Sequence, residues 1–235
     1  MSKRKICIIT TLVMLILMLV IPMLRLFVSL SGQHLVMQKH IIILGVLSVV
    51  FASAGVVFLK SREVEESNGK LVSILLFFIF PVSIIHIIYW SVESRDIFVS
   101  LLSVGWAILS GLCMLCGCSI KGLKVTSFIL SGLMAVPTAF FLFVLLVFSA
   151  ISANTVVNTV VSPNGEYRAE VISSDQGALG GDTFVDVYSE KYIIEIRDTP
   201  ERVYFDGWGA HEHMSIYWES DNVLIINGED YEIIP

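Results

Sequence analysis

Five long apolar runs occupy the first two thirds of the chain, and shorter runs of alternating polarity occupy the rest. A helix needs about 20 mostly apolar residues to cross the hydrocarbon core of a bilayer. Runs of that order cover residues 6–30, 41–59, 71–90, 97–115 and 125–150. The pattern predicts five membrane-spanning helices. The first run is longer than a signal-peptide core and no clear cleavage site follows it, so we interpret it as an uncleaved anchor.

The pattern after residue 152 is typical of strands. Alternating runs lie at 167–173, 183–188, 192–197, 203–205, 214–218 and 223–226, with 231–234 as a candidate last strand. Asn227-Gly228 favours a tight hairpin because both residue types tolerate positive φ. The predicted fold is a five-helix α-helical transmembrane bundle (residues 1–151) followed by a small antiparallel all-β domain (residues 152–235), built as one sheet or a small sandwich.

Composition and charge agree with this division. The chain is 55% hydrophobic and only 15% charged, with a mean hydropathy of +0.81, whereas soluble domains carry about 25% charged residues. Residues 1–150 hold eleven Lys/Arg and five Asp/Glu, and residues 151–235 hold four and sixteen, so +6 and −12 sum to the net charge of −6. The tail therefore repels nucleic acid and anionic headgroups and favours basic protein surfaces or loosely held divalent cations. The alternative is that the charge serves only solubility.

The flanks of the five runs indicate sidedness by the positive-inside rule. One set of flanks holds Lys3, Arg4, Lys5, Lys60, Arg62, Lys70, Lys121 and Lys124, and the other holds Arg25, Lys39 and Arg95. The excess places the N-terminus in the cytoplasm and the acidic tail outside it, in a multi-pass protein of the cell membrane. Tyr89 and Trp90 fall at the expected outer end of the third run, where amphipathic aromatic residues are enriched.

Small residues form faces on two of the expected helices, which would allow close helix packing in lipid. These are Gly45, Ser48, Ala52 and Gly55 on the second, and Ser100, Ser103, Ala107 and Ser110 on the fourth. One interpretation is packing within the bundle, and the other is a seam between copies of the chain. The bilayer itself is the partner that the apolar runs imply.

Two clusters could bind a metal. Cys113, Cys116 and Cys118 have the spacing Cys-x-x-Cys-x-Cys, with Cys7 as a candidate fourth thiol, but no histidine or carboxylate lies nearby in sequence. His211 and His213 would share one face of a strand and could share a metal. Their alternative is a solvated loop after Gly207, Gly209 and Ala210. Neither cluster reaches a full ligand set, so no cofactor is expected.

The tail resembles a family of uncharacterised small β domains found in membrane-anchored proteins of Gram-positive bacteria. The resemblance rests on Ser162-Pro163-Asn164-Gly165, Asp175-Gln176-Gly177-Ala178, Val185-Asp186-Val187, and Trp218 with Asn222, Leu224, Ile226 and Gly228. It implies a bacterial envelope protein and transfers no catalytic residue.

No Gly-x-Ser-x-Gly, His-Glu-x-x-His or phosphate-loop motif occurs in the sequence. We therefore expect a non-enzymatic membrane protein that presents the acidic β module outside the cytoplasm, for interaction or sensing in the cell envelope. The alternative is a component of a transporter or channel. His86 in the third run is the candidate polar residue for that role, although an interfacial histidine bonded to a carbonyl would also explain it.

Overall fold

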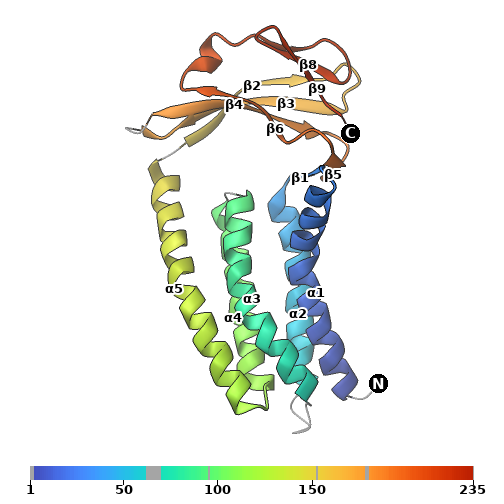
Figure 1. Cartoon of the computed structure of the whole chain (residues 1–235), viewed down its shortest axis with the longest axis vertical. Helices are drawn as coiled ribbons and strands as arrows, with labels where there is room; N and C mark the ends of the chain where they lie inside the picture. Colours follow the sequence, from blue (N-terminus) through green and yellow to red (C-terminus); the bar gives the residue numbers. More distant parts are fainter. Residues whose placement is uncertain (1–2, 62–69, 95, 152, 178–179, 235) are drawn as a thin grey trace. The chain divides into compact units, whose positions relative to one another are not determined.

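The computed structural model describes all residues except 1–2, 62–69, 95, 152, 178–179 and 235 (Figure 1). Arg62, Arg95 and Ala178, which the sequence arguments used, lie outside the described residues. The chain divides into two compact units, Met1–Pro22 with His40–Leu145, and Met23–Lys39 with Leu146–Pro235. The second break is close to the expected boundary after residue 151, but nothing in the sequence pattern assigned residues 23–39 to the tail.

Five long apolar helices account for most of the chain before the β region. They are α1 (Lys3–Leu30), α2 (His40–Ser61), α3 (Lys70–Ser94), α4 (Ile97–Gly117) and α5 (Lys121–Ile151). Each contains a stretch long and apolar enough to cross a membrane, judged by length and composition. The prediction of five such helices is confirmed, and each helix contains the run predicted for it.

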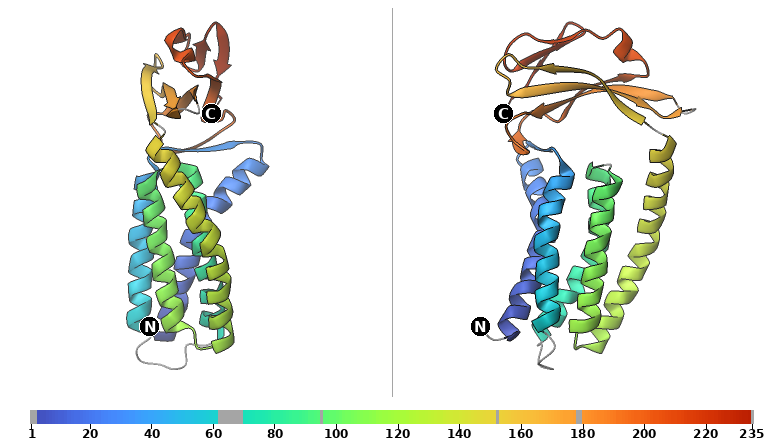
Figure 2. Two further views of the ribbon diagram at one scale, coloured as in Figure 1. Left: turned by 90° about the vertical axis from the view of Figure 1, so that its left-hand side faces the viewer. Right: turned by 180° about the vertical axis from the view of Figure 1, so that it is seen from behind.

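Hydroxyl pairs join α3 to α4, which lies beside it in Figure 2. The Oγ atoms of Ser83 and Ser110 lie 2.8 Å apart, and Ser91 donates to Ser100 over 2.8 Å. All four small residues predicted to form one face of α4 are buried. The hydroxyls of the four paired serines therefore have partners, as an apolar surrounding favours.

The predicted small-residue face of α2 is only half correct. The Ser48 hydroxyl accepts a hydrogen bond from Trp106 Nε1 over 2.7 Å, and Gly55 packs against α4, where a Cβ would lie 2.7 Å from a Leu109 methyl carbon. Ala52, however, is exposed, and a Cβ on Gly45 would meet nothing within 4 Å. Bulkier residues complete the buried stripe of this helix, so small size alone did not identify it.

The described residues of the second unit form nine strands in three antiparallel sheets. The strands are β1 (His34–Met37), β2 (Ala153–Val161), β3 (Tyr167–Asp175), β4 (Gly181–Ser189), β5 (Ile194–Arg197), β6 (Arg202–Gly207), β7 (Ile216–Trp218), β8 (Val223–Ile226) and β9 (Glu229–Glu232). Their orders are β1-β5, β2-β3-β4-β6 and β7-β8-β9. The sequence pattern missed β1 and β2 because one lies between two apolar runs and the other directly follows one.

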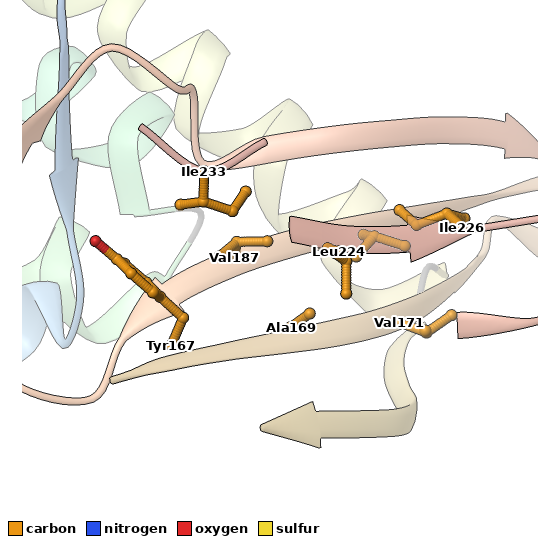
Figure 3. Packing of buried hydrophobic residues seen from close by; sticks show 8 residues of the cluster. Tyr167, Ala169, Val171, Val187, Leu224, Ile226 and Ile233 are labelled. Atoms are coloured by element: carbon orange, nitrogen blue, oxygen red, sulfur yellow. The ribbon is translucent and has the colours of Figure 1, made fainter. Parts of the chain in front are cut away.

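The four-stranded and three-stranded sheets enclose one core (Figure 3). Its buried members come from β3, β4, β8 and the segment after β9, and are Tyr167, Ala169, Val171, Val185, Val187, Leu224, Ile226 and Ile233. Trp218 Nε1 also donates to the Val160 carbonyl over 3.1 Å, which ties β7 to β2. Of the two predicted architectures, the sandwich is the one formed.

Turn residues fix the two hairpins that the sequence marked most clearly. Asn227 and Gly228 have φ of 54° and 86° and join β8 to β9 in the expected two-residue loop. In the loop from β2 to β3, the Asn164 side-chain oxygen accepts from the Ser162 hydroxyl and the Glu166 N–H, at 2.7 and 2.9 Å. Gly165 has a φ of 73°. The Ser-Pro-Asn-Gly motif is therefore a structural turn.

Candidate functional site: an acidic surface on the β unit

The histidine pair does not lie on a strand, so the strand interpretation is wrong and the alternative, a loop before the next strand, is the better description. His211 is in a short 3₁₀ turn (Ala210–Glu212) and His213 caps it. With three residues per turn, side chains two positions apart point in different directions. His211 is partly buried and His213 is exposed. Among the described residues, no group of three or more His, Cys, Asp and Glu could hold a metal ion.

The cysteines lie where small apolar side chains pack. Cys7, Cys113 and Cys118 are buried, and Cys116 is half-buried. Within the part of the chain that the structure describes, they do not join further ligands into a metal-binding group. Burial of this kind is usual for cysteine acting as a small hydrophobic residue.

His86 has a different partner from the one expected. Its Nε2 accepts a hydrogen bond from Trp90 Nε1 over 3.0 Å, and its ring stacks on Trp106 with centroids 4.9 Å apart. Trp90 is completely buried within the protein, and its position at the level of the membrane interface stays a prediction. His86 Nδ1 has no hydrogen-bond partner among the described residues.

The feature that distinguishes the surface of the β unit is its charge. Residues 203–235 contain seven acidic residues and no lysine or arginine. All seven side chains are exposed, and we call this set the acidic surface: Asp206, Glu212, Glu219, Asp221, Glu229, Asp230 and Glu232. They come from the end of β6, from the connections around β7 and β8, and from β9. The fold leaves all seven carboxylates exposed, although they come from different elements of the unit.

Tyrosines orient two of these carboxylates. The Tyr204 hydroxyl donates to Asp206 over 2.7 Å and Tyr231 donates to Glu229 over 3.1 Å. The hydrogen bond from Tyr204, with one from the Gly207 N–H, lowers the pKa of Asp206 below its usual value. The carboxylate of Asp206 is therefore held charged in one position.

Exposed aromatic residues accompany the carboxylates. Phe205, Trp208 and Tyr217 are all more than half exposed. A guanidinium or ammonium group binds favourably over such rings and pairs with nearby carboxylates. Aromatic residues are also enriched among the few that carry most of the binding free energy in protein interfaces. The surface is chemically suited to a basic protein segment.

A second charged cluster on the unit is internally neutralised. Arg202 binds Asp186 through two hydrogen bonds of 2.9 and 3.1 Å and lies 3.5 Å from the centroid of the Phe184 ring. Tyr188 donates to Glu201 over 3.0 Å. Burial raises the pKa of Glu201 above its usual 4.5, and the nearby Asp186 raises it further. The sequence did not reveal this cluster because only the β4–β6 register sets Asp186 opposite Arg202.

No protein-family model, curated protein or solved structure matches this chain. The resemblance of the tail to small β domains of Gram-positive membrane proteins therefore stays a prediction. Function must be inferred from the residues of the chain itself.

Proposed function

We propose that this chain is a multi-pass protein of the cell membrane that presents its β unit outside the cytoplasm as a non-enzymatic binding module for basic protein partners. The acidic surface carries the proposal, because seven exposed carboxylates without a single Lys or Arg between residues 203 and 235 favour a cationic partner. Sensing in the envelope would use the same surface.

Membrane insertion is supported by helices whose outer faces are more apolar than their inner faces. On α5 the exposed stripe is Val125, Ile129, Leu133, Val136, Phe140 and Phe143. The buried positions of the same helix include Ser127, Ser131 and Thr138. An apolar surface of this extent is unfavourable in water and suits the hydrocarbon of a bilayer.

The orientation is supported by basic residues at alternate helix ends. Lys3 and Lys5 begin α1, Lys60 lies at the end of α2, Lys70 begins α3, and Lys121 and Lys124 begin α5. If each helix crosses once, these ends share one side, and the excess of Lys and Arg makes it the cytoplasmic side. The β unit follows α5 and would lie on the opposite side.

The test uses an exposed position on the unit. Ser215 is exposed, and Ser215→Cys would be labelled on intact cells with a membrane-impermeant thiol reagent that carries a photo-crosslinker. Lys121→Cys is the control for the opposite side and should react only after lysis. Labelling of Ser215→Cys only after lysis would contradict the topology.

Captured partners are then compared with a charge-neutralised variant. Glu219→Gln, Asp221→Asn and Asp230→Asn remove three exposed carboxylates from the acidic surface. We expect a reproducible basic partner whose capture is lost in this variant and weakened at high salt. Salt screens surface charges, and the screening length falls from about 8 Å at physiological ionic strength to about 3 Å at 1 M. Capture that is indifferent to both changes would contradict the binding role.

Transport is the second candidate, and one observation favours it. His86 is buried in the helical unit and its Nδ1 has no partner among the described residues; ionisable groups inside spans often mark transport pathways. Ion or solute flux in reconstituted vesicles that disappears in His86→Ala, while the fold is retained, would move the assignment to a transporter component.

A further inference from the structure

Strand β5 has the opposite polarity from a water-facing strand. Ile194 and Ile196 point outward and are 39% and 43% exposed, whereas Glu195 is mostly buried and Arg197 is completely buried. A sheet between a core and water places its apolar residues inward and its charges outward. The reversal in β5 indicates that its outer face does not contact bulk water.

The inward side of β5 is held by specific bonds. Arg197 donates to the carbonyls of Val187 and Thr199 over 2.8 Å and of Pro200 over 3.0 Å. Tyr167 donates to Glu195 over 3.3 Å. A shift of one residue would break these bonds and reverse every side chain. The outward position of the two isoleucines is therefore fixed.

The apolar face extends beyond β5. In the ladder with β1, Leu35 pairs with Ile196 and Met37 with Ile194 on the same face, but both β1 side chains are buried, so the exposed part of this face belongs to β5. Just before β5, Tyr192 and Ile193 are 50% and 45% exposed. We call the four exposed residues Tyr192, Ile193, Ile194 and Ile196 the ribbon patch.

Chain connectivity limits where the ribbon patch can lie. Three residues separate the end of α1 from β1, and two separate β1 from α2. The N–H groups of Ser31 and Gln33 both donate to the Val28 carbonyl over 3.1 Å, so the chain turns directly at the end of α1. An extended chain advances at most about 3.6 Å per residue. If α1 and α2 cross the bilayer, β1 lies within the headgroup layer, and β5 is hydrogen-bonded to it.

The charge at this position also suits a lipid surface. Lys191 is the only lysine after residue 150, and its Nζ lies 5.2 Å from the centre of the Tyr192 ring. Tyrosine and lysine are both favoured at the headgroup level, where a ring and an alkyl stem are buried and the polar tip stays wet. In contrast, residues 203–235, which carry the acidic surface, contain no Lys or Arg, and anionic headgroups repel this surface.

We propose that the ribbon patch is inserted in the headgroup interface of the bilayer, so that the β unit is held on the membrane by its own β1–β5 ribbon in addition to its link to α5. This rests on the membrane insertion in the proposed function. The occupant of the patch is lipid. Its residues include a tyrosine and three isoleucines, Lys191 lies beside them, and β5 is hydrogen-bonded to β1, which follows the end of the membrane helix α1.

Spin labels in the full chain test the proposal. In a background with the four cysteines replaced by serine or alanine, single cysteines at Ile194, Ile196, Ile129 and Tyr217 carry a nitroxide, and the protein is reconstituted in vesicles of phosphatidylcholine and phosphatidylglycerol. Ile129 lies on the exposed face of α5 and Tyr217 is an exposed aromatic position on β7. We expect the ratio of oxygen to chelated-nickel accessibility at 194 and 196 to exceed that at 217 several-fold.

The outcomes separate the two proposals. A low ratio at Ile129 would overturn membrane insertion itself. A high ratio at Ile129 with free nickel access at Ile194 and Ile196 would overturn only the interfacial patch. Immobile labels at 194 and 196 that neither reagent reaches would mean that protein, such as a second copy, covers the patch, and would also overturn it.

A measurement on the unaltered chain guards against misfolding of the cysteine-free background. Lipids with a photoreactive group near the headgroup are mixed into the same vesicles, and the adducts are located by mass spectrometry. We expect adducts within residues 191–196 and none on the turn of Asn227 and Gly228. The reverse distribution would contradict the inference.

Discussion

Replacing Arg197 by methionine tests whether a buried cation holds the β unit together. Methionine keeps an unbranched apolar stem but removes the guanidinium, which is completely buried and donates to three backbone carbonyls. It also leaves Glu195 without the cation that lies 3.5 Å away. Burial lowers the pKa of Arg197, yet arginine stays charged at neutral pH.

The size of the effect follows from what is left behind. Removing one partner of a buried ion pair costs about 3–5 kcal/mol, because the other groups remain buried without a partner. Pro200 is exposed, and water can reach that part of the site. We therefore expect the low end, about 3 kcal/mol, which corresponds to an increase of about 100-fold in the opening constant.

Hydrogen exchange of the full chain in lipid nanodiscs measures this locally. Peptides that cover β4 and β5 should exchange about 100-fold faster in Arg197→Met, while peptides from α3 and α4 stay unchanged. Arg168→Met is the matched control. Arg168 is paired with Glu170 and Glu190 but is about one third exposed, so its loss should cost about 1 kcal/mol or less.

Glu195→Gln adds a second check. In the Arg197→Met background it removes the unpaired carboxylate and should restore part of the protection. If Arg197→Met accelerates exchange no more than Arg168→Met, the reasoning about the buried cation is refuted.

Three further changes test other contacts. In Gly181→Ala, the new Cβ would lie 2.1 Å from a backbone oxygen of β3, so we expect a loss of about 2 kcal/mol in stability, measured by melting or hydrogen exchange. Gly207 has open space around it, so Gly207→Ala should change the stability little. Equal effects of the two variants would contradict the packing argument. In Gly117→Ala, the Cβ would lie 2.3 Å from a ring carbon of Phe58, whereas a Cβ on Gly105 would have no atom within 4 Å. We therefore expect a lower Tm of the helical unit in Gly117→Ala than in Gly105→Ala. Similar Tm values would argue against the contact with Phe58. The raised pKa of Glu201 means that the folded unit binds the proton more tightly than the unfolded chain. Glu201 therefore adds stability as pH falls from neutral towards 4.5 and removes it as pH rises. Melting curves of Glu201→Gln should lack this pH dependence, and identical pH slopes in both proteins would exclude the contribution of Glu201.

Local signals account for what could be predicted about the fold. A long apolar run specifies a helix wherever it lies, because its backbone bonds are made within the segment. The Asn227-Gly228 hairpin likewise depends on the φ preferences of two adjacent residues. The acidic character of the tail needs only composition. For these features the sequence and the structure agree.

Contacts distant in the chain account for what was missed. Gln33 and Asp198 are 165 positions apart, yet the Gln33 side chain donates to Asp198 over 3.0 Å beside the β1–β5 ladder. Strand β1 is too short to be recognised without its partner. The spacing of His211 and His213 left a strand and a solvated loop open, because spacing alone does not distinguish a strand from a 3₁₀ turn. The stacking of His86 on Trp106 was missed because it depends on how α3 packs against α4.

The sequence by itself determined five apolar helices, an antiparallel β tail and the separation of charge between them, since these follow from polarity and local backbone preference. Only the tertiary structure decided which charges are neutralised and which are available. The β4–β6 register sets Asp186 against Arg202, whereas the carboxylates of the acidic surface stay exposed. On β5, which pairs with β1, Arg197 is buried while Ile194 and Ile196 face outward, because successive side chains of a strand point to opposite faces.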